Sequence, residues 1–145
     1  MADYEVENKT VTLTVPTQGS VAVISISGWI IWMHRYVPSN FDWNLTRNDY
    51  KNGFGASDSD DFWLGLERVH LLTTSGSYRL RLEWQEETTD YWLSTEYWLF
   101  YVTDEATFYE LHVSGYVNGD DGRALCVRNS SLILYKLHIS YTYIM

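Results

Sequence analysis

Residues 50–65, with the sequence YKNGFGASDSDDFWLG, decide the fold of this chain. Gly53 and Gly55 follow a segment of helix-forming residues, and glycine permits chain reversals at which a Cβ atom would clash. These reversals bring three large aromatic side chains to one hydrophobic core, namely Phe54, Phe62 and Trp63. We therefore expect packing to be the role of this aromatic cluster.

Two short helices flank the stretch. Residues 45–54 predict the first, with Asn44 or Thr46 as its N-cap and the two glycines at its end. Residues 66–72 predict the second, which ends in the polar turn TTSG. Between them, residues 57–61 predict a solvated acidic loop.

Strand patterns dominate the rest of the chain. In residues 77–84, SYRLRLEW, every second side chain is apolar and the others are polar or charged, which is typical of a strand with one buried face. Residues 29–33, WIIWM, are apolar throughout and fit a strand covered on both faces. Further strands are predicted at residues 10–15, 21–27, 91–102, 109–116 and 131–143. The sequence therefore predicts one α+β domain over residues 1–145, mainly antiparallel sheet with a few short helices.

The charge balance argues against polyanionic partners. Lys and Arg total 10 and Asp and Glu total 19, so the formal net charge of −9 would repel nucleic acid and acidic membrane surfaces. Arg79 and Arg81 are the nearest approach to a basic patch, and their spacing predicts a solvated ladder on one strand face. No stretch approaches the ~20 apolar residues that span a bilayer. We expect neither a nucleic-acid nor a membrane partner.

Cysteine content and glycosylation sequons bear on the cellular compartment. Cys126 is the single cysteine, which rules out an intramolecular disulfide and any CxxC metal or redox motif. Three N-glycosylation sequons begin at Asn8, Asn44 and Asn129, and together they favour secretion. The first ten residues are acidic where a signal peptide would be basic and then apolar. The chain is thus a mature secreted form, a fragment, or an intracellular protein.

No motif indicates a metal site. The acidic loop with Asp58, Asp60 and Asp61 lacks the glycine and glutamate positions of an EF-hand. Residues 118–122, NGDDG, consist of ordinary turn formers. The four histidines have no ligand spacing, and a structural role is expected for two of them, His70 and His112; the others are His34 and His138.

Catalytic motifs and cofactor motifs are also absent. The sequence contains neither a GxSxG elbow nor a glycine-rich phosphate loop. Arg123 and Arg128 are near enough in sequence to lower the pKa of the Cys126 thiol, but we expect Cys126 to be a lone thiol without a function. We predict no enzyme activity, no catalytic residue and no cofactor.

Several motifs, in the same order along the sequence, resemble those of the fibrinogen-related, or fibrinogen C-terminal-like, domain family. They are NF at residues 40–41, YKNGFG at 50–55, FWLG at 62–65, HLLT at 70–73, YRLR at 78–81, DEA at 104–106 and LHVSGY at 111–116. Gly28, Trp29 and Arg35 resemble an earlier strand of the family. The resemblance covers residues 28–122, fits residues 1–27 weakly, and leaves residues 123–145 as a divergent β-like tail. The resemblance implies that the chain folds as the central subdomain of a fibrinogen C-terminal-like domain.

The chain departs from the family pattern in its cysteines and its C-terminal part. The family has an early cysteine pair and a later pair near its ligand pocket, and neither pair occurs here. The family's calcium loop and its pocket for acetylated sugars or protein partners lie beyond the segment matched by Gly115 and Tyr116. The resemblance therefore implies a shortened domain, and it transfers neither calcium binding nor acetyl-group recognition.

The resemblance predicts a secreted, non-enzymatic recognition or adhesion module that binds a glycan or an extracellular protein in innate defence or matrix adhesion. Its candidate ligand-binding residues are three aromatics expected at the surface, Trp92, Tyr97 and Trp98. The alternative is a structural scaffold or truncated gene product without its own ligand, which self-associates into a homo-oligomer through a sheet edge. The acidic start leaves a third reading, an intracellular protein that uses the fold without disulfides.

Overall fold

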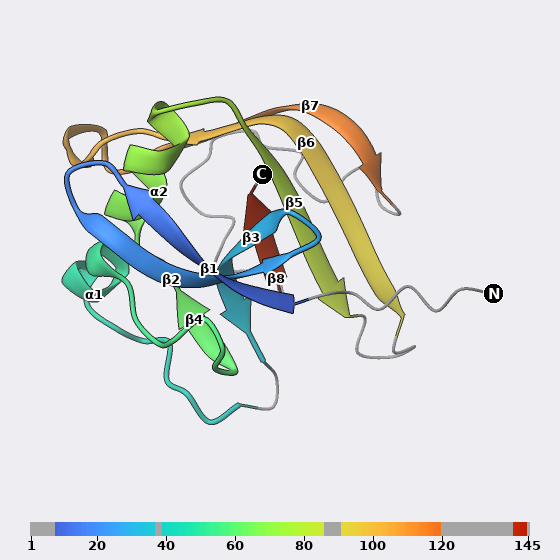
Figure 1. Cartoon of the computed structure of the whole chain (residues 1–145), viewed down its shortest axis with the longest axis horizontal. Coiled ribbons are helices and arrows are strands. Elements are labelled where there is room, and N and C mark those ends of the chain that lie inside the picture. The colour runs from blue at the N-terminus through green and yellow to red at the C-terminus, as the bar shows by residue number, and fades with distance from the viewer. Residues whose placement is uncertain (1–7, 37–38, 86–90, 120–140, 145) are drawn as a thin grey trace.

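The computed structural model describes residues 8–36, 39–85, 91–119 and 141–144 of the 145-residue protein (Figure 1). The described elements, in sequence order, are β1 (Asn8–Val15), β2 (Gly19–Ile26), β3 (Trp29–Arg35), α1 (Arg47–Asn52), β4 (Asp61–Trp63), α2 (Leu66–Thr74), β5 (Tyr78–Gln85), β6 (Trp92–Val102), η1 (Glu105–Thr107), β7 (Leu111–Gly119) and β8 (Tyr141–Ile144). The predicted α+β architecture, mainly antiparallel sheet with short helices, is confirmed. No helix in the described ranges has the length and apolar character needed to cross a bilayer.

One antiparallel sheet contains the eight described strands. Its main path runs β1-β2-β3-β8-β5-β6-β7, and the short strand β4 pairs with β3 beside that path. Strand β8 pairs with β3 on one side and with β5 on the other, so the Cα atom of Tyr143 lies opposite both Ile31 and Arg81. It thereby joins the N-terminal strands to the β5-β6-β7 half, as the red arrow beside β3 and β5 shows in Figure 1. The remainder of the predicted strand at residues 131–143, from 131 to 140, lies outside the described residues.

The two faces of β5 separate the hydrophobic core from a charged surface, as the alternation predicts. Leu80 and Leu82 are buried on one face, and Arg79, Arg81 and Glu83 occupy the other. The buried face continues across β6, because register partners in a sheet share a face: Leu80 lies opposite Tyr97 and Leu82 opposite Thr95. The core therefore lies on one side of β5 and β6, whereas β3 is buried on both faces at Ile31 and Trp32, as predicted for residues 29–33.

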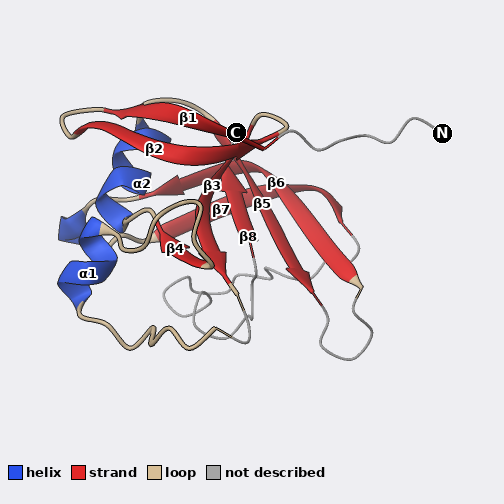
Figure 2. Ribbon diagram, turned by 60° about the horizontal axis from the view of Figure 1, so that its bottom comes forward, coloured by secondary structure: helices blue, strands red, loops and turns tan. Residues whose placement is uncertain are grey.

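Helix α2 covers this core face close to β6. Its Val69 and Leu72 are fully buried, and its His70 Nδ1 lies 2.8 Å from the carbonyl oxygen of Val102 in β6. Trp32 of β3 completes the core, because its ring centroid lies 5.1 Å from that of Trp63 and 5.5 Å from that of Phe100. Figure 2 shows both helices at the same end of the sheet.

The stretch at residues 50–65 folds as its glycines predict. Helix α1 begins after Thr46, whose hydroxyl accepts a hydrogen bond from the backbone N–H of Asp49 at 3.2 Å, so Thr46 and not Asn44 is the N-cap. Gly53 ends the helix at a φ of 92°, and a Cβ atom there would lie 2.5 Å from the carbonyl oxygen of Leu64. The reversal lets Phe54 exchange two backbone hydrogen bonds of 2.9 Å with Trp63.

The aromatic cluster around Phe54 packs as predicted. Phe62 and Trp63 are 4% and 2% exposed. The Phe54 ring contacts three further aromatic rings at centroid distances of 5.1 to 5.5 Å, those of Phe41, Trp43 and Tyr50. The expected packing role is confirmed.

Some predicted boundaries are wrong by a few residues. Helix α2 continues to Thr74, because the Thr73 hydroxyl donates to the Val69 carbonyl within the helix instead of opening a turn. Strand β7 begins at Leu111 and not at residue 109, because Tyr109 has a φ of 55°, which no extended strand has. Of the predicted turn at 118–122, residues 118 and 119 belong to β7, and the others lie outside the described residues.

Candidate functional site

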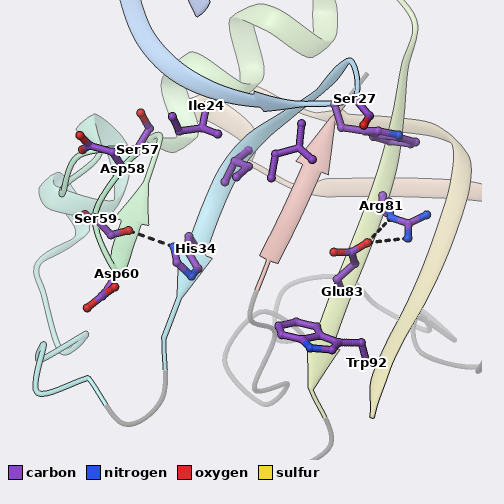
Figure 3. Close-up of a pocket in the computed structure, with 13 residues that line it drawn as sticks. Ile24, Ser27, His34, Ser57, Asp58, Ser59, Asp60, Arg81, Glu83 and Trp92 are labelled. Carbon is purple, nitrogen blue, oxygen red and sulfur yellow. Dashed lines mark hydrogen bonds and ion pairs between the residues drawn. The ribbon is translucent and has the colours of Figure 1, made fainter. Parts of the chain in front are cut away.

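A cleft of about 710 Å³ lies over the charged face of the sheet (Figure 3). Strands β2 and β3 line one side with apolar side chains, namely Ile24, Ile26, Trp29 and Ile31. Residues 57–60 line a second side, and β5 and β6 line the third with Arg81, Glu83 and Trp92. The cleft thus offers an apolar wall, an acidic loop and an ion pair within one depression.

An ion-pair ladder crosses the β5 and β6 side of the cleft. Arg79 Nη2 donates to Glu96 Oε2 at 2.8 Å, and Arg81 bonds both Glu96 and Glu83, the latter through Nε at 2.6 Å. The predicted placement of both arginines on one strand face is confirmed. The arginine side chains are 25% and 28% exposed, so the ladder is largely covered. The prediction that the ladder is solvated is therefore wrong.

The ladder fixes the charge of Arg81. Burial by itself would lower the pKa of this guanidinium, but hydrogen bonds and charge attraction from Glu83 and Glu96 outweigh it and raise the pKa above its ordinary value. Arg81 is therefore always charged, and the two carboxylates neutralise it. It orders the floor of the cleft and leaves no surplus positive charge there.

Arg79 also lies between two tryptophan rings. Its guanidinium carbon is 4.3 Å from the ring centroid of Trp98 and 5.4 Å from that of Trp29. Arginine stacks on aromatic faces in this way, and each such contact contributes about 0.5–2 kcal/mol. An arginine of β5 thereby connects a tryptophan of β3 to one of β6, and it holds Trp98 in place.

His34 ties the acidic loop to β3. Its Nδ1 lies 3.1 Å from the carbonyl oxygen of Ser59, so a neutral ring with the proton on Nδ1 donates to that carbonyl, the contact drawn in Figure 3. Burial lowers the pKa of His34 from its ordinary value, and this outweighs the raising influence of the Ser59 carbonyl, Asp60 and Asp61. The ring is therefore neutral at physiological pH, and in the described structure it links β3 to the acidic loop.

The acidic loop divides into exposed and buried carboxylates. Asp58 and Asp60 are exposed, as predicted, and they line the cleft. Asp61 is only 7% exposed and accepts hydrogen bonds from the Trp43 indole Nε1 at 2.7 Å and from the Ser39 hydroxyl. The prediction of a solvated loop is wrong for Asp61, because hydrogen bonds from the half-buried Trp43 and Ser39 side chains hold its carboxylate inside.

The three predicted ligand-binding aromatics do not share one surface. Trp92 and Trp98 are 52% and 58% exposed, whereas Tyr97 is 5% exposed and faces the core beside Leu80. The expectation that Tyr97 is exposed is wrong, because strand alternation places it opposite its neighbour Trp98. The register also shifts within β6, so that both Trp98 and Leu99 reach the surface. Of the three residues, Trp92 alone lines the cleft.

The remaining predicted sites lie elsewhere. Asn44 is exposed in the loop before α1, where its backbone N–H donates to Asp42 Oδ1 at 2.8 Å. Asn8 begins β1, and its side chain is outside the described set, as are Asn129 and Cys126 with Arg123 and Arg128. His138, Asp120 and Asp121 also lie outside the described residues.

The other described histidines pack against their neighbours. His70 joins α2 to β6, and the ring of His112 stacks on that of Tyr101 with centroids 4.5 Å apart. Within the described ranges, no group of three or more His, Cys, Asp or Glu side chains could hold a metal ion. The cleft offers apolar, aromatic and ionic contacts to a ligand.

Sequence reasoning missed the apolar wall and the role of His34 in the cleft. The signal was present in part, because Ile24 and Ile26 have the two-residue spacing of a single strand face. What the sequence did not indicate is that β2 places this face opposite residues 57–60, which lie more than 30 positions further along the sequence.

Comparison with known proteins identifies relatives of the chain. A family described as fibrinogen beta and gamma chains, C-terminal globular domain, matches residues 22–143. The fibrinogen gamma chain of the lamprey Petromyzon marinus is 39% identical over 106 residues, which cover 68% of this chain and 23% of that protein. Ryncolin-4 of Cerberus rynchops is 33% identical over 105 residues, covering 70% of this chain and 29% of that protein.

Solved structures agree with these relatives. The fibrinogen-like globe domain of human ANGPTL6 superimposes with a TM-score of 0.73 at 26% identity, covering 85% of this chain and 55% of that domain. Lamprey fibrin D-dimer, solved with the peptide ligand Gly-His-Arg-Pro-amide, gives a TM-score of 0.69 at 28% identity, covering 79% of this chain and 38% of that one. The chain thus spans about half of the solved globe domain and less than a third of the curated relatives cited.

Proposed function

Because the protein belongs to the family formed by the C-terminal globular domain of the fibrinogen beta and gamma chains, we propose that it is a secreted, non-enzymatic recognition module that binds a glycan or an extracellular protein. The family is a family of recognition domains and is generally non-enzymatic. A fold by itself does not determine a ligand, so the proposal rests on a site of this protein.

The observation that supports the proposal is the exposed indole of Trp92 at the margin of the cleft. It is 52% exposed and borders a depression of about 710 Å³, within the usual size range of ligand sites. Tryptophan is enriched among the residues that contribute most to binding. The ion-pair ladder beneath it fixes the shape of the floor, which lowers the entropic cost of binding.

The ligand site proposed here is not the family's known one. The family's calcium loop and acetyl-group pocket lie beyond the segment that the motifs of this sequence match. The cleft on the charged sheet face therefore supports ligand binding, in innate defence or in matrix adhesion, by residues that the protein itself supplies.

A pair of arrays tests the proposal. The wild-type protein is applied to a glycan array and to an array of extracellular protein domains, with and without calcium. We expect at least one binder, and Trp92→Ala should weaken that binding about tenfold or more. Phe108→Ala is the matched control, because Phe108 is 77% exposed at the end of η1 and is not among the described residues that line the cleft. Absence of any binder, or equal losses in both variants, contradicts the proposal.

Self-association through β7 is the second candidate function. Strand β7 ends the described sheet and pairs only with β6 among the described strands, and the adjacent Leu99 and Tyr116 are 44% and 46% exposed. A strand at the edge of a sheet, with exposed apolar neighbours, invites pairing with another copy. Light scattering over a range of concentrations separates this scaffold role from the first, since a monodisperse monomer at high concentration counts against it.

A further inference from the structure

The charges around the cleft are unbalanced. Among the described lining residues, three carboxylates face one guanidinium: Asp58, Asp60 and Glu83 against Arg81. Glu83 and Glu96 both bond Arg81, so its positive charge is neutralised within the ladder. The neutral ring of His34 adds no positive charge. The described lining therefore carries net negative charge, and the protein as a whole has a formal net charge of −9.

The two exposed carboxylates stand on an ordered turn. The backbone N–H of Ser59 donates to the Ala56 carbonyl at 2.9 Å, and the Ser59 hydroxyl donates to the same carbonyl at 2.6 Å. His34 holds the Ser59 carbonyl from β3. The turn therefore presents Asp58 and Asp60 in fixed positions, which makes their attraction for a cation specific and not diffuse.

The apolar wall determines what else the occupant carries. The half-buried side chains of Ile24 and Ile26 form a surface that a simple cation would leave uncovered, whereas Ile31 behind them in the lining is only 4% exposed. The exposed ring of Trp92 on the far side can take an apolar side chain or a cationic one, since tryptophan is the best cation–π acceptor. An extended peptide advances ~3.3 Å per residue with side chains on alternating faces, so it can meet both surfaces at once.

We propose that the cleft binds an extended peptide segment in which Lys or Arg alternates with apolar residues. The basic side chains meet Asp58 and Asp60, and the apolar ones lie against the isoleucine wall and Trp92. Charge complementarity between a negative cleft and a basic segment selects this occupant. The inference names a ligand class for the site of the proposed function and rests on that function.

A labelled hexapeptide of alternating arginine and leucine, capped at both ends, tests the inference by fluorescence anisotropy at 0.15 M salt. Asp58→Asn with Asp60→Asn should weaken binding about fivefold. The matched double variant Asp42→Asn with Glu110→Gln removes two exposed negative charges outside the cleft and should change the Kd less than twofold. The same peptide with glutamate in place of arginine should not bind.

Other outcomes overturn the inference. Equal weakening in both double variants means that the field of the whole molecule attracts the peptide and the cleft does not. If the arginine–leucine peptide does not bind, or if the glutamate peptide binds as well, charge complementarity does not select the ligand and the inference fails. A neutral glycan that displaces the peptide and is unaffected by the aspartate variants assigns the cleft to a sugar. In that last case Trp92→Ala still weakens binding on the arrays, so the proposed function stands while the peptide inference fails.

Discussion

The indole Nε1–H of Trp43 donates a hydrogen bond of 2.7 Å to the buried carboxylate of Asp61. This contact joins the loop before α1 to the first residue of β4. Asp61 Oδ2 also accepts from the Ser39 hydroxyl, so one carboxylate holds the loop at two points. The Phe54 aromatic cluster includes Trp43, and the contact therefore orders the part of the sequence that decides the fold.

Removal of the Asp61 carboxylate should destabilise the protein strongly. Asp61→Ala leaves the half-buried Trp43 and Ser39 donors without their partner, and we expect a loss of about 1–3 kcal/mol in the free energy of unfolding. Asp60→Ala, at the neighbouring exposed position, should change it by about 0.5 kcal/mol or less. Urea denaturation of both variants measures the difference, and similar small effects would show that the Trp43 contact contributes little.

A second pair of variants separates backbone strain from steric clash at the glycines. Gly19 and Gly53 both have positive φ angles, of 79° and 92°. A Cβ atom added at Gly19 would meet no atom within 4 Å. A Cβ atom added at Gly53 would lie 2.5 Å from the carbonyl oxygen of Leu64. Gly19→Ala should cost about 1 kcal/mol, and Gly53→Ala about 3 kcal/mol or more. Thermal and urea unfolding measure both values. Equal costs would mean that the turn at Gly53 relaxes freely.

Sequence reasoning predicted these local features because glycines, caps and strand alternation act over a few residues. It gave the helix ended by Gly53 and the two faces of β5, although it placed Tyr97 on the wrong face. It did not predict that β8 separates β3 from β5, because no local pattern encodes which strands pair at a distance of more than 60 residues. The cleft depends on that long-range pairing, which is why the sequence could indicate Trp92 as an exposed aromatic residue but could not indicate the isoleucine wall opposite it.

The ion-pair ladder should contribute measurable stability. Glu96 bonds both Arg79 and Arg81 with a side chain only 16% exposed, and Glu96→Ala leaves both guanidinium groups short of a partner. We expect a loss of about 1–2 kcal/mol, since a partly covered network exceeds the usual value of surface pairs. Glu110→Ala, with a side chain 50% exposed, should be near neutral in the same urea experiment. A salt-independent effect at Glu96 would argue for packing over charge.

Acidification from pH 7.5 to 5.5 should weaken the fold through His34. Burial lowers the pKa of His34 in the folded state, so the unfolded state takes up the proton first, near its ordinary pKa of about 6.5. Stability is therefore complete above that pH and declines below it. His34→Asn, which keeps a donor for the Ser59 carbonyl, should show a smaller decline over the same range. Parallel declines in both proteins would remove His34 as the cause.

Secretion should leave a mass signature at Asn44. The residue is exposed and begins a sequon, so the protein, directed through a secretory pathway by an added signal sequence, should carry a glycan there. Treatment with a glycosidase should lower the mass, and Asn44→Gln should reduce that change. An unchanged mass with all three sequons intact would favour the intracellular reading.

The most direct test of the cleft as the binding surface is a nuclear magnetic resonance titration of the tryptophan indole N–H groups with the arginine–leucine hexapeptide. Trp29 and Trp92 line the cleft, whereas the indoles of Trp43 and Trp63 donate internally to Asp61 and to the Tyr50 carbonyl. Saturable shifts of the Trp29 and Trp92 signals, with the Trp43 and Trp63 signals unmoved, are the predicted result. Shifts confined to other tryptophans, or none at saturating peptide, would contradict it.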